Sequence, residues 1–400
     1  MRKTMVLILL ALVFGTVGLQ AQSANVVCGD LDEADCALLI EAQENLAGLS
    51  SYGVNITGAV SISNIPDLPG DINIALAGTG AISGDLSGIH MSQEEAMALS
   101  TDPEAAFDFI AAQLQSVNAE ALVTITLPDE LVAQSDGQLP AAIPLELRLV
   151  DGVAYLNFDA LRGALGQQGE NLPAGWYGLD LQDLFERLMA MSDAMGIEPM
   201  DPEIAAHFSD LDRISEFVSV ERLDDTTAAD GTEVASFHTV IDYAALMTAV
   251  YGDPAMRDLL EEAMAEQGQT LTDEEMDRMI GMMQQIFQGV TFEVFQTVGL
   301  EDRLPRSVQV TFNWNLQPMV DAMIEAGEGD LGLEGPAPRF SLNLTQTYRD
   351  FDQIDEIIAP EDATIVPLDA LMSGMTGMSG MSELQAAPAE DVEVTPTAAG

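Results

Sequence analysis

Strict alternation of apolar and polar residues is the feature that most constrains the fold of this chain. In residues 307–316, SVQVTFNWNL, every second side chain is apolar, and the residues between are Gln, Thr and Asn. The same period of two runs through residues 53–62, 72–82, 121–127 and 340–348. A strand of this kind has one dry and one wet face, which is typical of antiparallel sheets.

Turn signals connect further strands into hairpins. Asp151-Gly152 joins residues 145–150 to 152–158 as a two-residue hairpin turn, and a turn at Asp230-Gly231 precedes the strand at 233–241. With residues 216–225 and 290–298 the chain has about ten strands, too many for a flat open sheet. We therefore expect the sheet to curl or to approach closure.

Helical segments lie between these strands. Helices are predicted at residues 92–100, 102–117 and 180–195, and a long helical stretch is predicted at 242–288. Strands interrupted by helices in this way predict an α+β fold. We expect one large curved antiparallel sheet, an incomplete barrel, with helices covering its concave apolar face.

The two ends of the chain differ from its middle. Residues 1–21 combine Arg2 and Lys3 with a short apolar run, which predicts a cleaved signal peptide rather than a membrane span. Residues 372–400, rich in Gly, Ser, Pro and Ala, predict a disordered tail. One domain is expected between them, at 22–371.

The two cysteines of the chain are consistent with an exported protein. Cys28 and Cys36 are the only two in the chain, and an oxidising compartment favours a disulfide between them. Cys28 follows Asn-Val-Val and not a lipobox, so no lipid anchor is expected. The sequence therefore predicts a secreted, extracytoplasmic protein.

The net charge of -53 excludes partners that are themselves anionic. Phosphate backbones and anionic headgroups are repelled by such a surface, so no nucleic-acid binding is expected. Two interpretations of the charge stay open: solubility in a salty or acidic medium, and diffuse binding of divalent cations.

The sequence contains no recognised catalytic motif. The three histidines, His90, His207 and His238, stand in contexts without a nucleophile pattern, and Lys3 is the only lysine. We expect no enzyme activity, although carboxylate pairs are plentiful enough to leave a hydrolase as an alternative. No cofactor and no metal are expected.

Methionines form two separate groups. Met372, Met375, Met378 and Met381 repeat every third residue, which makes a weak Cu(I) candidate beside the interpretation as a low-complexity tail. Met279 and Met283 share a face of a predicted helix. They are either helix core or a pliable apolar wall for a ligand.

Four segments, taken in chain order, carry a resemblance to a known family. They are a helix and first strand at 45–62, a hairpin ending in GWYGLDL at 151–181, a strand-turn-strand-helix unit at 220–247, and a closing segment at 347–367. This order resembles the LolA/LolB-like superfamily, and within it the LppX/LprG-type exported lipid-binding proteins. The missing lipobox, the long stretch at 242–288 and the Met-rich tail depart from that pattern.

The resemblance implies a non-catalytic carrier or sensor that holds an acyl chain or lipid in a cavity between sheet and helices. We expect a monomer with a transient partner in the cell envelope. The alternative is a structural or interaction protein of the envelope with a filled core. The Trp176 side chain either contacts the ligand at the rim of the cavity or is packed in the hydrophobic core. The residues expected to line the cavity are Val54, Ile56, Ile74, Leu76, Val123, Ile125, Leu147, Tyr155, Trp176, Phe237, Phe292, Phe312, Trp314, Leu342, Met279 and Met283.

Overall fold

The structure is a computed structural model of the chain. It describes residues 26–65, 70–86, 103–135, 139–195, 215–228, 230–254, 256–258, 261, 272–325 and 336–367. The predicted signal peptide at 1–21, the predicted helix at 92–100, His90, His207 and the tail at 372–400 with its methionines lie outside these residues.

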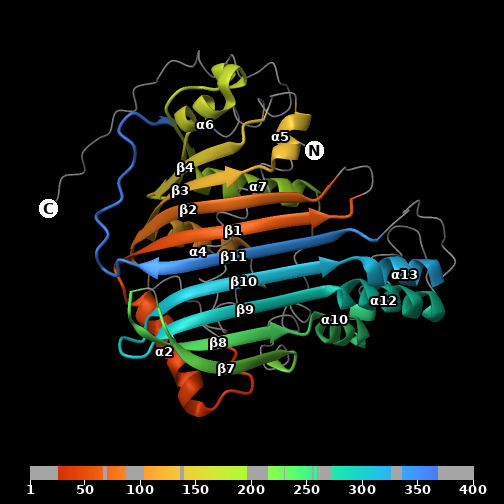
Figure 1. The fold of residues 1–400 in the computed structure, drawn as a ribbon. Helices are drawn as coiled ribbons and strands as arrows, with labels where there is room; N and C mark the ends of the chain where they lie inside the picture. Colours follow the sequence, from red (N-terminus) through yellow and green to blue (C-terminus); the bar gives the residue numbers. More distant parts are fainter. Residues whose placement is uncertain are drawn as a thin grey trace.

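Twelve strands form one sheet (Figure 1). Their order is β12-β6-β5-β4-β3-β2-β1-β11-β10-β9-β8-β7, and every neighbouring pair is antiparallel except β12 with β6. The bounds are β1 Ser51–Ser63, β2 Ile72–Gly84, β3 Val117–Thr126, β4 Ala142–Val150, β5 Val153–Asn157, β6 Trp176–Asp180, β7 Val218–Thr227, β8 Glu233–Ile241, β9 Val290–Gly299, β10 Pro305–Asn315, β11 Arg339–Arg349 and β12 Thr364–Ile365.

The predictions of an α+β fold and of antiparallel pairing are confirmed. The expected curling into an incomplete barrel is wrong: the sheet is open and not strongly curled, with β7 and β12 as its edges. The strands β5, β6 and β12 span five, five and two residues. This side of the sheet therefore tapers, and its last strand offers too short a ladder to close onto β7.

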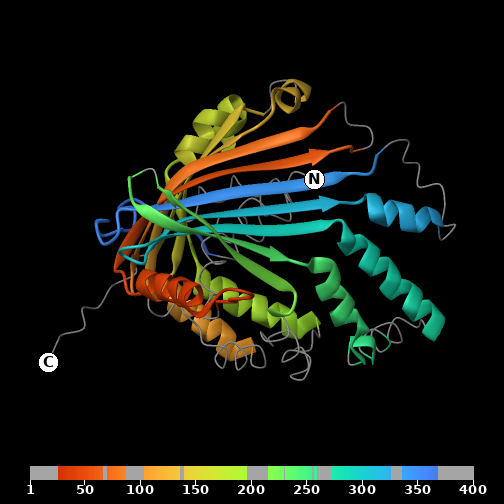
Figure 2. The same cartoon turned by 60° about the horizontal axis from the view of Figure 1, so that its bottom comes forward.

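The helices gather in groups around the sheet. They are α2 Glu33–Ala47, α4 Pro103–Ser116, α5 Asp129–Gln134, α6 Phe158–Leu165, α7 Leu181–Met195, α10 Tyr243–Gly252, α12 Asp273–Gln288 and α13 Gln317–Glu325, with a 3-10 turn at Gly166–Asn171. Figure 2 shows α2, α4 and α7 on the same side of the sheet. The α10, α12 and α13 helices extend from its strand ends, so the helices do not form one layer over the apolar face.

Helices α4 and α7 confirm two of the predictions, and α10 and α12 lie within the helical stretch predicted at 242–288. The α10 helix follows β8, α12 precedes β9, and α13 follows β10. Because these strands are antiparallel neighbours, all three helices meet at one end of them. Within the described ranges, each helix is too short or too polar to span a bilayer.

The alternation predicted along each strand divides the sheet into two faces. We call the face that packs against α2 the inner face. There Val220, Phe237 and Val298 pack with Leu38 and Leu39 of α2. Residues that lie directly opposite each other on neighbouring strands point to the same face of the sheet. Val54 of β1 lies opposite both Gly80 of β2 and Tyr348 of β11, so all three positions belong to the inner face.

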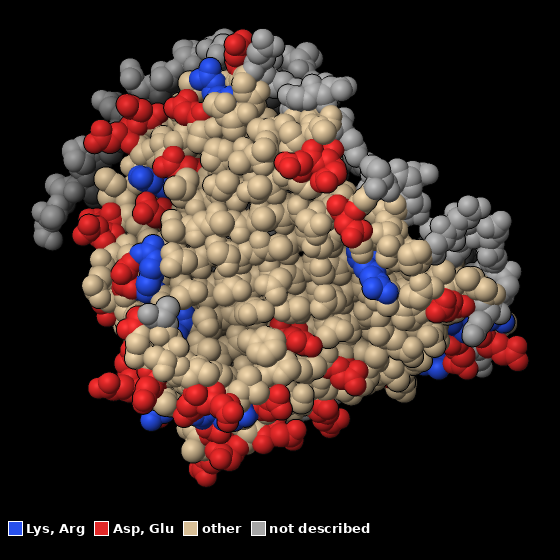
Figure 3. Space-filling model, viewed as in Figure 1, with Lys and Arg blue, Asp and Glu red and all other residues tan. Residues whose placement is uncertain are grey.

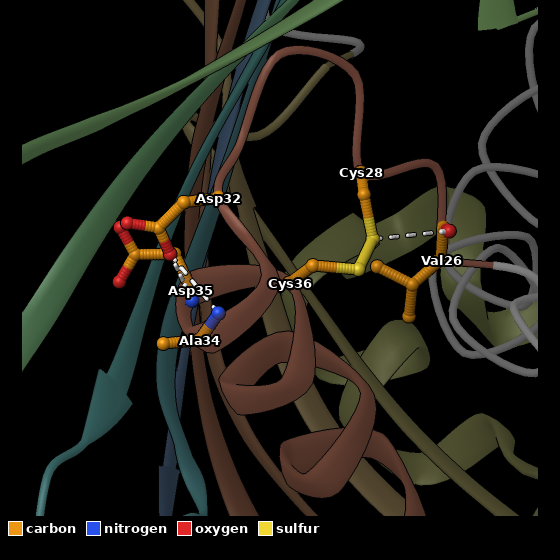
Figure 4. Close-up of a disulfide and its surroundings, with 6 residues drawn as sticks. All are labelled: Val26, Cys28, Asp32, Ala34, Asp35 and Cys36. Carbon is orange, nitrogen blue, oxygen red and sulfur yellow. Dashed lines mark hydrogen bonds between the residues drawn. A yellow bond between two sulfur atoms is a disulfide. The ribbon is translucent and has the colours of Figure 1, made fainter.

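The predicted disulfide between Cys28 and Cys36 is confirmed (Figure 4). It joins the segment before α2 to the first turns of that helix, with a Cα–Cα distance of 5.3 Å. Asp32 caps the helix by accepting hydrogen bonds from the backbone amides of Ala34 and Asp35, at 3.0 Å each. A covalent bond and a cap therefore fix the start of α2.

An ion pair then attaches α2 to the edge of the sheet. Asp35 accepts a hydrogen bond from Arg222 of β7, which also contacts Asp225. The Arg222 guanidinium lies 5.2 Å from the centre of the Phe237 ring. Two carboxylates therefore neutralise this arginine on the inner face.

The closing segment after β11 packs on the outer face of the sheet. Ile354 and Ile357 lie against a cluster that contains Val150, Tyr155 and Trp176. The segment is held at its start by Asp352, whose carboxylate accepts hydrogen bonds from the backbone N and the Oγ of Ser50, at 2.7 and 2.9 Å. The fold therefore has apolar packing on both faces of the sheet.

Candidate functional site

A continuous group of large apolar side chains on the inner face is left partly exposed. We call this group the inner strip, and it consists of Phe292, Val294, Val310, Phe312, Trp314, Phe340 and Leu342. None of the seven belongs to the buried clusters formed by the described residues. Partly exposed aromatic and aliphatic side chains that share one face make this strip the candidate site for an apolar ligand.

Pairing between β9, β10 and β11 builds the strip. Phe312 lies directly opposite Phe292 on one side and Leu342 on the other. The rings of Phe312 and Phe340 meet edge to face, with centroids 5.8 Å apart. Three adjacent strands therefore place their aromatic residues in one continuous surface.

Helices bound the strip at the ends of the strands. The Trp314 indole Nε1 donates a hydrogen bond to the backbone oxygen of Ile286 in α12, at 3.4 Å. The Tyr243 ring at the start of α10 lies 6.2 Å from the Phe292 ring. These contacts fix the position of the helices against one end of the strip.

The α12 helix contains both of the methionines expected to contact ligand. Its first turn is fixed by a capping box between Thr272 and Glu275. Met276 is buried, whereas Met279 and Met283 are partly exposed. The partial exposure of Met279 and Met283 is compatible with a pliable wall, which stays a prediction.

Most of the other residues expected to line a cavity are packed inside the core. Val54, Ile56, Ile74, Val123, Ile125, Leu147 and Phe237 belong to buried clusters, and Leu76 packs against three of these. Val123 is 0% exposed and Phe237 is 1% exposed, so ligand contact there would require the core to open. Phe292, Phe312, Trp314 and Leu342 are the members of the expected set that lie on the inner strip.

Tyr155 and Trp176 lie on the opposite face from the strip, so their expected place in the same cavity is wrong. Register pairs Asn157 with Trp176, and Trp176 packs under the closing segment. The Arg148 guanidinium stacks 5.2 Å from the Trp176 ring centre. Of the two alternatives left open by the sequence, the structure therefore supports the second, in which the Trp176 side chain is packed in the hydrophobic core.

The pattern around Trp176 explains this error. Its neighbour Tyr177 points to the inner face, where its ring meets Phe158 edge to face at 5.5 Å. Because consecutive aromatic residues occupy opposite faces, the period of two does not indicate which of them faces inward.

The sequence analysis missed two polar residues on the inner face. Gln346 of β11 and Gln296 of β9 both lie opposite Val308, one on each side of β10. Gln346 is only 6% exposed. The signal was present in the sequence, because in FSLNLTQTY Gln346 falls in phase with Leu342, Leu344 and Tyr348.

The described strands place no charged side chain within the strip. On β9, on β11 and on β10 from Ser307 onward, the charged residues Glu293, Arg339 and Arg349 occupy outer-face positions. Arg306, at the bulge where β10 begins, is paired with Asp302. Burial raises the pKa of Tyr52 to about 12 and raises that of Tyr348 well above its usual value. Both hydroxyls therefore stay neutral, and this part of the sheet suits an uncharged ligand surface.

The central outer face is also uncharged, but it is polar. Figure 3 shows a broad surface without acidic or basic side chains, with charges gathered around its margin. It includes Asn55, Thr57, Thr79 and Thr345, which alternate with the inner-face residues. Apart from the exposed Leu122, which lies opposite Thr79, these small polar side chains make a flat wet surface and not an apolar site.

Among the described residues there is no group of three or more His, Cys, Asp or Glu that is able to hold a metal ion. His238 lies on the outer face, where its ring stacks on Phe295 at 4.2 Å between Glu221 and Glu293.

No family model matches the sequence, and no curated protein matches it. Among solved structures the chain is similar to LprF from Mycobacterium bovis, a protein of the LppX/LprG type. The match covers 81% of this chain and 95% of LprF, with 11% sequence identity and a TM-score of 0.27.

Proposed function

We propose that this chain is an exported, non-catalytic protein that binds a hydrophobic ligand with an acyl chain against the inner strip. The observation that carries the proposal is the strip itself: seven large apolar side chains share one face and remain partly exposed. In a chain with a net charge of -53, an exposed apolar surface of this size marks a place where an apolar molecule binds and shields it from water.

The energetics support a ligand of this class. Burying one methylene group is worth about 0.8 kcal/mol, so a long acyl chain gains roughly 10 kcal/mol before the costs of ordering. The aromatic rings of Phe292, Phe312 and Trp314 offer broad contact area at a low entropic cost.

Export is part of the same proposal. The disulfide between Cys28 and Cys36 is of the kind that persists in an oxidising compartment. We infer cleavage of a signal peptide at residues 1–21, a single ligand-binding domain at 22–371, and a transient envelope partner. The acidic surface favours release from anionic membranes.

The test is lipid extraction from the purified protein with mass spectrometry, followed by titration with Nile red, a neutral apolar dye. We expect a co-purifying lipid and saturable uptake of the dye. Leu342→Asp should abolish uptake because it puts a charge in the strip, whereas Asn343→Asp, on the other face of the same strand, should leave it unchanged. Equal uptake by both variants, or no uptake by the wild type, contradicts the proposal.

A structural or interaction role is the second candidate, and the uncharged outer face favours it. Five strands, β3, β2, β1, β11 and β10, taken over about eight residues each, cover roughly 600 Å² at about 4.8 Å between strands and 3.3 Å per residue. A standard interface buries about 800 Å² on each partner. This face is therefore the part of an acidic molecule on which a second copy fits with least repulsion.

Sedimentation velocity distinguishes this second candidate from the monomer that the sequence predicts. Self-association through the outer face should give dimers that Thr57→Glu with Thr345→Glu disrupts, since these two residues lie directly opposite each other. A wild type that stays monomeric at all concentrations removes the second candidate and leaves ligand binding untouched.

A further inference from the structure

His238 lies on the outer face of β8 with an acidic side chain beside each of its ring nitrogens. Nδ1 is 3.3 Å from Oε1 of Glu221 on β7, and Nε2 is 3.6 Å from Oε2 of Glu293 on β9. The ring also stacks on Phe295 of β9, with centroids 4.2 Å apart and planes within 6° of parallel. One imidazole therefore connects three neighbouring strands at the edge of the sheet.

A neutral ring satisfies only half of this arrangement. Neutral imidazole has one N–H donor and one acceptor nitrogen, whereas both carboxylates are acceptors. Whichever nitrogen carries the proton, the lone pair of the other faces a carboxylate. Nε2 is occluded from solvent and has no hydrogen-bond partner among the described residues, and leaving an occluded acceptor beside an anion costs free energy.

The protonated ring satisfies the whole arrangement. Both nitrogens then donate, one to Glu221 and the other toward Glu293, and hydrogen bonds between ionised groups are stronger than those between neutral ones. The positive ring also lies over the π face of Phe295, which attracts a cation. The other outer-face neighbours of the ring on these three strands are uncharged: Ser219, Leu223, Ser236, Val240 and Thr297.

The charge of this ring acts on β7, which is the last strand of the sheet and pairs with β8 on one side. Glu221 faces outward to His238, and the next residue, Arg222, faces inward and binds Asp35 of α2. The same short stretch of β7 therefore holds the ring on one face and α2 on the other. Because α2 covers the inner face beside the inner strip, loosening this stretch also loosens the attachment of α2.

We propose that His238 is a proton-dependent clamp: its cationic ring holds β7 to β8 and β9, and loss of the proton loosens this edge together with α2. Histidine is the side chain that ordinarily changes its charge between about pH 5 and 8. The side chain is 19% exposed, so the ring exchanges its proton with solvent. Because the two carboxylates bind the cation, the clamp is closed at lower pH and opens as the pH rises. The inference goes beyond ligand binding and does not rest on it.

The test is hydrogen exchange with mass spectrometry on the full chain at pH 6 and pH 8.5, with rates corrected for the intrinsic pH dependence of amide exchange. Protection of the amides of β7 and α2 should fall about fivefold from the lower to the higher pH, while β1 and β2 in the centre of the sheet stay unchanged. His238→Gln should show the lower protection at both pH values. Glu221→Gln combined with Glu293→Gln keeps the histidine but removes its acidic partners, so it should abolish the pH dependence.

The matched control replaces the other two histidines, His90 and His207, by glutamine and should keep the wild-type response. Equal protection of β7 at both pH values, or greater protection at pH 8.5, overturns the proposal, and so does a His238→Gln variant that keeps the wild-type response. Thermal unfolding checks that each variant folds. Glu293→Gln alone, with its response reduced to about twofold, carries the same test if His238→Gln does not fold. No ligand takes part in this experiment, so its result is independent of Nile red uptake.

Discussion

Phe237 and Phe312 are two phenylalanines on one face of one sheet that should behave in opposite ways when each is replaced by alanine. Phe237 is 1% exposed and belongs to the cluster that packs against α2. Phe312 is partly exposed and belongs to the inner strip. The pair therefore tests whether the strip is a binding surface or simply more core.

The expected magnitudes follow from burial. Phe237→Ala leaves a cavity in a closed cluster and should lower the free energy of unfolding by about 4 kcal/mol. Phe312→Ala should lower it by only about 1 kcal/mol, since its ring lies outside the buried clusters. A ring that buries roughly 50 Å² against ligand contributes about 1.3 kcal/mol, or about ninefold in affinity.

The assay combines urea unfolding followed by circular dichroism with titration of Nile red. Phe312→Ala should bind about ninefold more weakly at nearly full stability, and Phe237→Ala should show the reverse when measured well below its unfolding midpoint. The reasoning is refuted if both variants lose about 4 kcal/mol of stability and Phe312→Ala keeps the wild-type affinity. In that case the strip is closed core.

Three further predictions concern stability. Replacing Cys28 and Cys36 by serine opens a loop of about nine residues and should cost about 2.5 kcal/mol in urea unfolding under oxidising conditions, and an unchanged midpoint would show that the disulfide does not constrain the unfolded chain. Trp176→Ala should lower stability by about 2 kcal/mol without any change in Nile red affinity, so weaker binding would contradict its place on the outer face. The hydrogen bonds from Ser50 lower the pKa of Asp352, so its contribution of about 1 kcal/mol is present above the pKa of the unfolded state and is lost as the pH falls through the lower folded-state pKa. Melting temperatures of Asp352→Asn and wild type should therefore differ at pH 7 and converge in acid.

The sequence predicted the strands well because their signal is local. In β1, β2, β10 and β11 the period of two places apolar and polar side chains on opposite faces, and the structure confirms these elements. The disulfide and the helices α4 and α7 also follow from neighbouring residues. The candidate site was predicted only in part, since Phe292, Phe312, Trp314 and Leu342 lie on the strip.

The residues that were misplaced depend on contacts made far along the chain. Phe237 is closed off by α2, which lies about two hundred residues earlier in the sequence. Trp176 is covered by the segment around Ile357, which comes long after it. No local pattern indicates which partner covers a given apolar side chain, so burial within a face was not predictable.

What the sequence determined by itself is which side chains of a strand share a face, because successive Cβ atoms point to opposite sides of any extended chain. Tertiary structure decided which face lies inward and which part of it stays open. Strand order brings β9, β10 and β11 together, and α2 closes the neighbouring part of the same face. Burial is a property of the assembled neighbours, so the partly exposed surface of the inner strip exists only in the folded protein.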